Sequence, residues 1–182
     1  DTNFVDYPYG FWVGSYYPWG ASGKIRPVFD LPQPAYAPQQ AELWLWTQLW
    51  QGANYATQPA TVCAYNVTTG YDISTVTWNS PWTSPGGDYD PMPLGCASLH
   101  ALPPAGTKVI IKLDPARLTY HVLLRTILED HDSSLYHAVT DANAAYRPAF
   151  VTSDVAPVVP EPTAQPGVTP PENRIDIVLE GQ

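Results

Sequence analysis

Charged side chains are scarce in this chain of 182 residues, and their scarcity excludes some partners. Asp, Glu, Lys and Arg make up 14% of the residues, well below the roughly 25% typical of soluble proteins. Only eight are Lys or Arg, they are scattered, and the formal net charge is −9. Binding a phosphate backbone requires clustered cations, so a nucleic-acid partner is not expected.

Long apolar runs and cysteines are also few. No stretch approaches the roughly 20 apolar residues of a membrane-spanning helix, so no membrane span is expected. The two cysteines, Cys63 and Cys96, are too few for a disulfide-rich miniprotein. One bond between them adds roughly 4 kcal/mol in an oxidising compartment. The alternative is a pair of buried, unpaired thiols, and the sequence leaves both open.

Proline and aromatic residues are abundant, with 21 Pro, 12 Tyr and 7 Trp. Such a composition is typical of β-rich extracellular proteins, whose strands favour aromatic residues and whose loops are stiffened by proline. The first residue is Asp1 rather than Met, which we expect of a mature secreted or cell-surface protein without its signal peptide. The length suits one domain, or one domain with an appendage.

Short segments of alternating or β-branched residues, separated by turn formers, predict an all-β fold. The predicted strands include residues 61–67, 74–80, 108–113, 135–140 and 145–154. Their spacing of about 10 residues indicates a two-sheet, jelly-roll-like sandwich. One short helix is expected over residues 115–129, because Asp114 can cap it and Pro115 suits its first position.

The segment AELWLWTQLW, residues 41–50, is apolar on both sides. In a strand, Leu residues 43, 45 and 49 share one face, which we expect to be core. The other face carries Trp44, Trp46 and Trp50. An outer row of three indoles requires a ligand, another part of the chain or another molecule.

The end of the chain has a different pattern. Residues 156–173 contain six prolines, so we expect a stiff, extended spacer of roughly 50 Å. Residues 174–182 then alternate like a half-buried strand. The strand residues are Arg174, Ile175, Asp176, Ile177, Val178, Leu179 and Glu180. We therefore expect a sandwich domain over 1–155, a linker over 156–173 and a terminal strand over 174–182.

Several motifs occur in one order: KIRPVFDLP, a proline-rich connection, AELWLW, TVCAYNV and STVTWNSPW. Over residues 1–155 this order resembles the disaggregatase-related family of extracellular β-sandwich domains, known as DNRLRE domains. The resemblance implies a jelly-roll-like sandwich, generally non-catalytic, with carbohydrate binding described for some members.

No catalytic motif is evident: nucleophile elbow, HExxH, phosphate-binding glycine loop and CxxC are all missing. We therefore expect no enzyme and no cofactor. Asp130 and Asp132 in EDHDSS are weak calcium candidates, since the run lacks the ligand spacing of a calcium loop; a solvated turn fits better. Asn66 opens an N-glycosylation sequon, NVT, and its alternative role is an outward polar strand residue.

Two functions remain. The first is a self-assembling subunit of an extracellular filament or surface layer, a homopolymer in which residues 174–182 complete a neighbour's sheet. The second is a carbohydrate-binding module or adhesin that uses the outer tryptophans to hold a polysaccharide. The terminal strand can also fold back onto its own domain, and a spacer of roughly 50 Å permits either arrangement.

Overall fold

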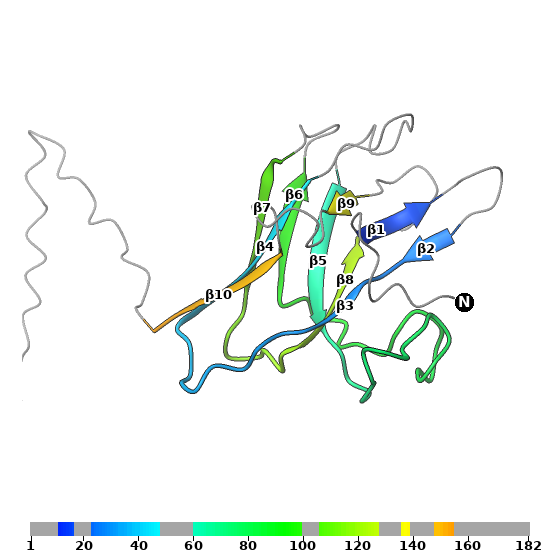
Figure 1. Ribbon diagram of the computed structural model, residues 1–182, viewed down its shortest axis with the longest axis horizontal. Coiled ribbons are helices and arrows are strands. Elements are labelled where there is room, and N and C mark those ends of the chain that lie inside the picture. Colours follow the sequence, from blue (N-terminus) through cyan, green and yellow to red (C-terminus); the bar gives the residue numbers. More distant parts are fainter. Residues whose placement is uncertain are drawn as a thin grey trace, which may run out of the picture.

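The computed structural model describes residues 11–16, 23–47, 60–99, 106–127, 136–138 and 148–154. All regular structure in these ranges is β (Figure 1). The strands are β1 Phe11–Tyr16, β2 Gly23–Ile25, β3 Val28–Asp30, β4 Gln40–Trp46, β5 Ala60–Asn66, β6 Gly95–Leu99, β7 Lys108–Leu113, β8 His121–Thr126, β9 Tyr136–Ala138 and β10 Ala149–Ser153. Within the same ranges, no helix is long and apolar enough to cross a membrane.

The strands form antiparallel sheets. One sheet has the order β10-β4-β7, a second has the order β3-β8-β5-β6, and a small third sheet has the order β2-β1-β9. The first two sheets share one hydrophobic core, to which β4 and β7 contribute from one side and β5 and β8 from the other. This arrangement is consistent with the predicted β-sandwich.

Strands β4 and β7 form where alternation predicts them. In β7, Val109, Ile111 and Leu113 are buried while the residues between them are exposed. In β4, Leu43 and Leu45 are buried and alternate with half-buried positions. Each fully buried aliphatic side chain of this kind contributes roughly 1.5–3 kcal/mol relative to exposure. The inward face of the β10-β4-β7 sheet is therefore the core side.

Strand β5 is buried on both faces, because a long loop covers the side that faces away from the main core. Residues 68–94 form a long excursion from the end of β5 (Figure 1) and place Val76 and Trp82 against Tyr65 and Leu123. Val62 and Ala64 point the other way, into the main core. The predicted strand at 61–67 is thus confirmed, and the loop gives the domain a second, smaller core.

The strand predicted over residues 74–80 is wrong, because these residues form turns and bends within the covering loop. Asp72 explains the difference: its Oδ1 accepts hydrogen bonds from the backbone N–H and the hydroxyl of Ser74, at 2.9 and 2.7 Å. An Asp side chain that closes a turn in this way competes with strand pairing.

The helix predicted over residues 115–129 is replaced by a turn at residues 115–117 and by strand β8. The Asp114 side chain still closes the turn, since its Oδ1 accepts the N–H of Ala116 at 3.0 Å. The chain then turns into β8, where the consecutive residues Val122, Leu123 and Leu124 are all buried. A run of apolar residues buried on both faces is typical of a central strand.

Two further predicted strands are confirmed, and the predictions for the end of the chain concern residues that the structure does not describe. Strands β9 and β10 lie within the predicted segments 135–140 and 145–154, whereas β6 was not predicted. The linker at 156–173 and the terminal strand at 174–182 lie outside the described residues.

Candidate functional site

The outer face of the β10-β4-β7 sheet carries the predicted aromatic residues. Trp44 and Trp46 are half-buried and point away from the core side defined by Leu43 and Leu45. Trp50 lies outside the described residues. The two indoles sit two residues apart on β4, on the same face of the sheet.

Trp44 is held by two polar neighbours on this face. Its Nε1 donates a hydrogen bond of 2.8 Å to Oε2 of Glu42. The Nζ of Lys108 lies 2.8 Å from the centroid of the Trp44 ring and 5.9 Å from that of Trp46. Cation–π contacts of this kind stabilise by about 0.5–2 kcal/mol. One side of the Trp44 ring is therefore covered by an ammonium group.

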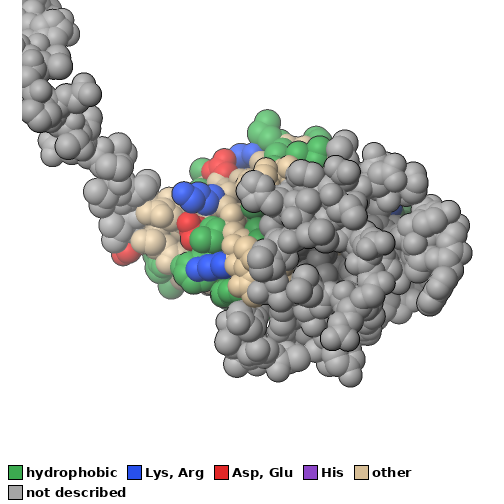
Figure 2. All heavy atoms as spheres, turned by 90° about the horizontal axis from the view of Figure 1, so that it is seen from above, with side chains coloured by type: hydrophobic (Ala, Val, Ile, Leu, Met, Phe, Trp, Pro, Cys, Tyr) green, Lys and Arg blue, Asp and Glu red, His purple; other side chains and the backbone are tan. Residues whose placement is uncertain are grey.

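The neighbouring strands add aliphatic groups to the same face. Strand register places Ile110 on one side of Trp44 and Ala149 on the other, while Val151 lies beside Glu42. Ile110 is 39% exposed. Figure 2 shows hydrophobic side chains mixed with acidic and basic ones on the described part of the surface.

The two cysteines form a disulfide. Cys63 on β5 and Cys96 on β6 are direct cross-strand partners, with Cα atoms 4.1 Å apart. Cys63 is fully buried, whereas Cys96 on the neighbouring strand is exposed. The bond closes the chain around the covering loop, residues 68–94, and thus ties that loop to the sheet.

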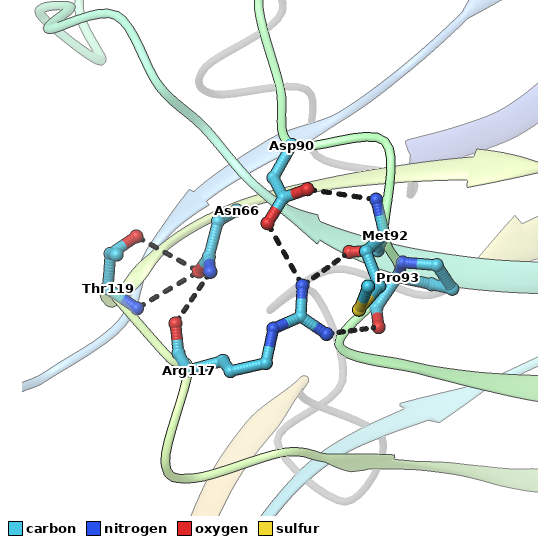
Figure 3. Close-up of polar contacts among 6 residues, drawn as sticks. All are labelled: Asn66, Asp90, Met92, Pro93, Arg117 and Thr119. Atoms are coloured by element: carbon cyan, nitrogen blue, oxygen red, sulfur yellow. Dashed lines mark hydrogen bonds and ion pairs between the residues drawn. The ribbon is translucent and has the colours of Figure 1, made fainter.

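Asn66 is a buried structural residue (Figure 3). Its side chain is 6% exposed. Nδ2 donates to the carbonyl oxygen of Arg117 at 2.6 Å, and Oδ1 accepts from the backbone N–H and hydroxyl of Thr119 at 2.9 and 3.0 Å. The Nδ2 that would carry a glycan is buried and already donates within the fold. The placement therefore argues against both glycosylation at the NVT sequon and an outward orientation.

Arg117 extends the same network toward β6. Its Nη2 lies 2.9 Å from Oδ2 of Asp90 and donates to the carbonyl of Met92 at 2.9 Å, while Nη1 donates to the carbonyl of Pro93 at 3.2 Å (Figure 3). The backbone N–H of Met92, and then Arg117, lower the pKa of Asp90. These contacts fix the end of the covering loop, which is a structural role.

A second polar group joins the covering loop to the sheet edge. The hydroxyl of Tyr71 donates to Oδ1 of Asp30 at 2.7 Å, and Nδ1 of His121 lies 2.8 Å from the same oxygen. Burial, followed by Asp30, raises the pKa of Tyr71. Tyr71 therefore stays protonated as a hydrogen-bond donor, which suits anchoring rather than proton transfer.

A shallow pocket of about 500 Å³ opens beside Tyr71; its lining residues are Gly70, Tyr71, Asp72, Thr75, Ser80 and Pro81. Inside the covering loop, Asp88 accepts hydrogen bonds from the backbone of Thr83 and the hydroxyl of Thr69, which lower its pKa to about 2. These bonds engage the Asp88 carboxylate within the covering loop and stabilise the conformation of that loop.

Neither pocket nor loop shows a metal-binding arrangement. Within the described ranges, no three His, Cys, Asp or Glu side chains cluster closely enough to hold a metal ion. The weak calcium candidates, Asp130 and Asp132, lie outside those ranges.

Comparisons of the sequence with protein-family models, with curated proteins and with solved structures returned no match.

Proposed function

We propose that this chain is a non-catalytic, secreted structural protein that assembles with copies of itself into an extracellular filament or surface layer. Residues 174–182 of one copy add a strand to a sheet of the next. As part of the same proposal, the chain is related to the disaggregatase-related sandwich domains and has a jelly-roll topology. The disulfide between Cys63 and Cys96 supports an oxidising, extracellular setting.

The observation that carries this proposal is the character of β10. Within the described residues, β10 pairs with β4 on one side and with no strand on the other. Strand edges in monomeric proteins are commonly protected by Lys, by Pro or by inward charges. Residues 149–153, AFVTS, contain none of these. An edge of this kind suits pairing with another strand.

The C-terminal sequence supplies a suitable partner strand. The last 28 residues of the sequence, 155–182, follow β10. They contain the proline-rich spacer and end with the alternating nonapeptide. A spacer of roughly 50 Å exceeds the roughly 30 Å diameter of a small domain. A donated strand can therefore reach a neighbouring copy, and head-to-tail donation without rotational closure builds a fibre.

Replacing Ile177 with Asp in the full chain should abolish assembly, because the charge falls on the apolar side of the donated strand. The matched control is Asp176→Asn, which changes the opposite side of the same segment. Sedimentation velocity and negative-stain microscopy measure the outcome. Filaments of normal length from Ile177→Asp, with Asp176→Asn also normal, would refute strand donation.

Carbohydrate binding is the second candidate, and it depends on the shared outward orientation of Trp44 and Trp46. Indole faces pack against sugar rings, and nearby polar side chains can hold hydroxyl groups. Lys108 weakens this candidate, because its ammonium group already covers one side of the Trp44 ring. A sugar on that side has to displace it.

The double variant Trp44→Ala/Trp46→Ala should lose retention on an insoluble polysaccharide if the second candidate holds. Tyr36→Ala is the control, because Tyr36 is an exposed aromatic residue (46%) outside strand β4. Affinity electrophoresis in polysaccharide gels gives the retardation of each variant. Equal retardation of the double variant and the native protein excludes this face as a sugar site.

A further inference from the structure

The sheets offer several strand edges, and most are unsuited to accept another strand. The outermost strands of the two large sheets are β10 and β7 in one and β3 and β6 in the other. The small sheet ends in β2 and β9, which have three residues each. Such short strands give little main-chain pairing to a donor of seven residues.

The edges of β6 and β7 face each other and leave no room for insertion. A side-chain Cβ at Gly95, the first residue of β6, would overlap the carbonyl oxygen of Lys112 on β7. The N–H of Asp114, just after β7, donates to the carbonyl of Leu94 at 2.8 Å. A strand inserted between β6 and β7 requires about 9.5 Å, twice the spacing of paired strands. The sandwich is closed on this side.

The edge of β3 is short and is already engaged. This strand has three residues and follows Pro27, which has no N–H to donate. The hydroxyl of Tyr71 in the covering loop lies 3.3 Å from the carbonyl oxygen of Phe29, the middle residue of β3. An incoming strand would have to displace this contact.

The edge of β10 is longer, because this strand has five residues, and one of them is an incompletely buried aromatic residue. Phe150 packs on the main core yet stays half-buried, as does Tyr120, and their rings meet edge-on with centroids 6.1 Å apart. Tyr120 adopts a φ of 68°, a left-handed conformation that is uncommon for a residue with a side chain. Backbone strain of this kind persists where the surroundings require it, often at functional positions.

We infer that the acceptor for the donated strand is the outer edge of β10 in a second copy of this chain, an edge that pairs with no strand within the described residues; this inference rests on the proposed function. The apolar side of the donor, Ile175, Ile177 and Leu179, covers the Phe150–Tyr120 pair. Its other side, Asp176, Val178 and Glu180, lies next to Val151 and extends the outer face that carries Trp44. The donor thus extends the cover of the main core beyond β10.

Cysteine cross-linking in the full chain tests this assignment. Val151→Cys is combined in turn with Asp176→Cys, Val178→Cys and Glu180→Cys, and each protein is assembled and mildly oxidised. Disulfides form where Cα atoms lie about 4.4–6.8 Å apart. The three donor positions share one face, so at least one lies near residue 151 in any register. Ile110→Cys on β7, with the same three donors, is the matched control.

We expect disulfide-linked ladders on non-reducing gels with Val151→Cys and none with Ile110→Cys. Ladders with Ile110→Cys, or intact filaments without a ladder from any Val151→Cys pair, overturn the β10 assignment and leave strand donation standing. Oxidation that yields only internally linked monomers overturns strand donation itself. Mixing two single variants, Val151→Cys and Val178→Cys, confirms that a ladder joins different copies.

Discussion

Replacing Cys63 and Cys96 with Ala is expected to lower the free energy of unfolding by about 2–4 kcal/mol. The bond joins residues 33 positions apart, so its loss frees the unfolded chain across a long segment. It also releases the covering loop, whose side chains bury one face of β5 and β8. Urea denaturation of the native and double-Ala proteins at neutral pH gives the difference directly.

The control for this experiment is the cross-strand pair two residues along the same two strands. Thr61 and Ser98 are register partners, and their exposed hydroxyls lie 3.3 Å apart. Changing both to Ala should alter the unfolding free energy by less than about 1 kcal/mol, as expected of surface substitutions. A double-Ala cysteine variant no less stable than this control contradicts the role given to the disulfide.

Asn66→Ala is expected to cost about 2–4 kcal/mol of stability, because it leaves buried groups without partners. The carbonyl of Arg117 loses its donor, and the N–H and hydroxyl of Thr119 lose their acceptor. These bonds hold the turn between β7 and β8 against β5. Thermal and urea unfolding both report the loss.

Asn79→Ala is the matched control, since Asn79 is an exposed residue of the covering loop. Its replacement should change the unfolding free energy by about 0.5 kcal/mol or less. Mass spectrometry of secreted native protein provides a second readout at residue 66, where we expect an unmodified Asn. Equal stability of the two variants, or a glycan on Asn66 in folded protein, contradicts the buried network.

Alternation alone predicted the parts of the fold in which one face of a strand is buried. KVIIKL became β7 at the expected residues, and the inward leucines and outward tryptophans of β4 followed from a period of two. These strands are predicted correctly because successive residues alternate between the core face and the outer face, and this alternation is visible in the sequence. The all-β class follows from the same signal.

Prediction of secondary structure from the sequence failed where side-chain hydrogen bonds determine the backbone path. Asp72 closes a turn in a segment rich in β-branched residues. Asn66 binds the backbone of Arg117 and Thr119, in the connection between β7 and β8 where a helix was expected. Asn66 and Thr119 are 53 residues apart. No local pattern reveals such a partner, so propensity favoured the wrong element.

Only the local features of the candidate site could be predicted, because its other contacts join residues that are distant in the sequence. The shared face of Trp44 and Trp46 follows from local alternation, but the contact with Lys108 depends on the pairing of β4 with β7. Likewise, the outer edge of β10, which has no strand partner among the described residues, and the closed edge of β7 depend on the order of strands in the sheets. The clue available in the sequence was the absence of Lys and Pro in AFVTS.

Electron cryomicroscopy of the native, full-length protein, purified as assembled material, tests strand donation most directly. The predicted result is a polymer in which density for residues 174–180 continues the β10-β4-β7 sheet of the adjacent copy, next to β10. A particle that stays monomeric at every concentration, or a terminal segment paired within its own molecule, would contradict it.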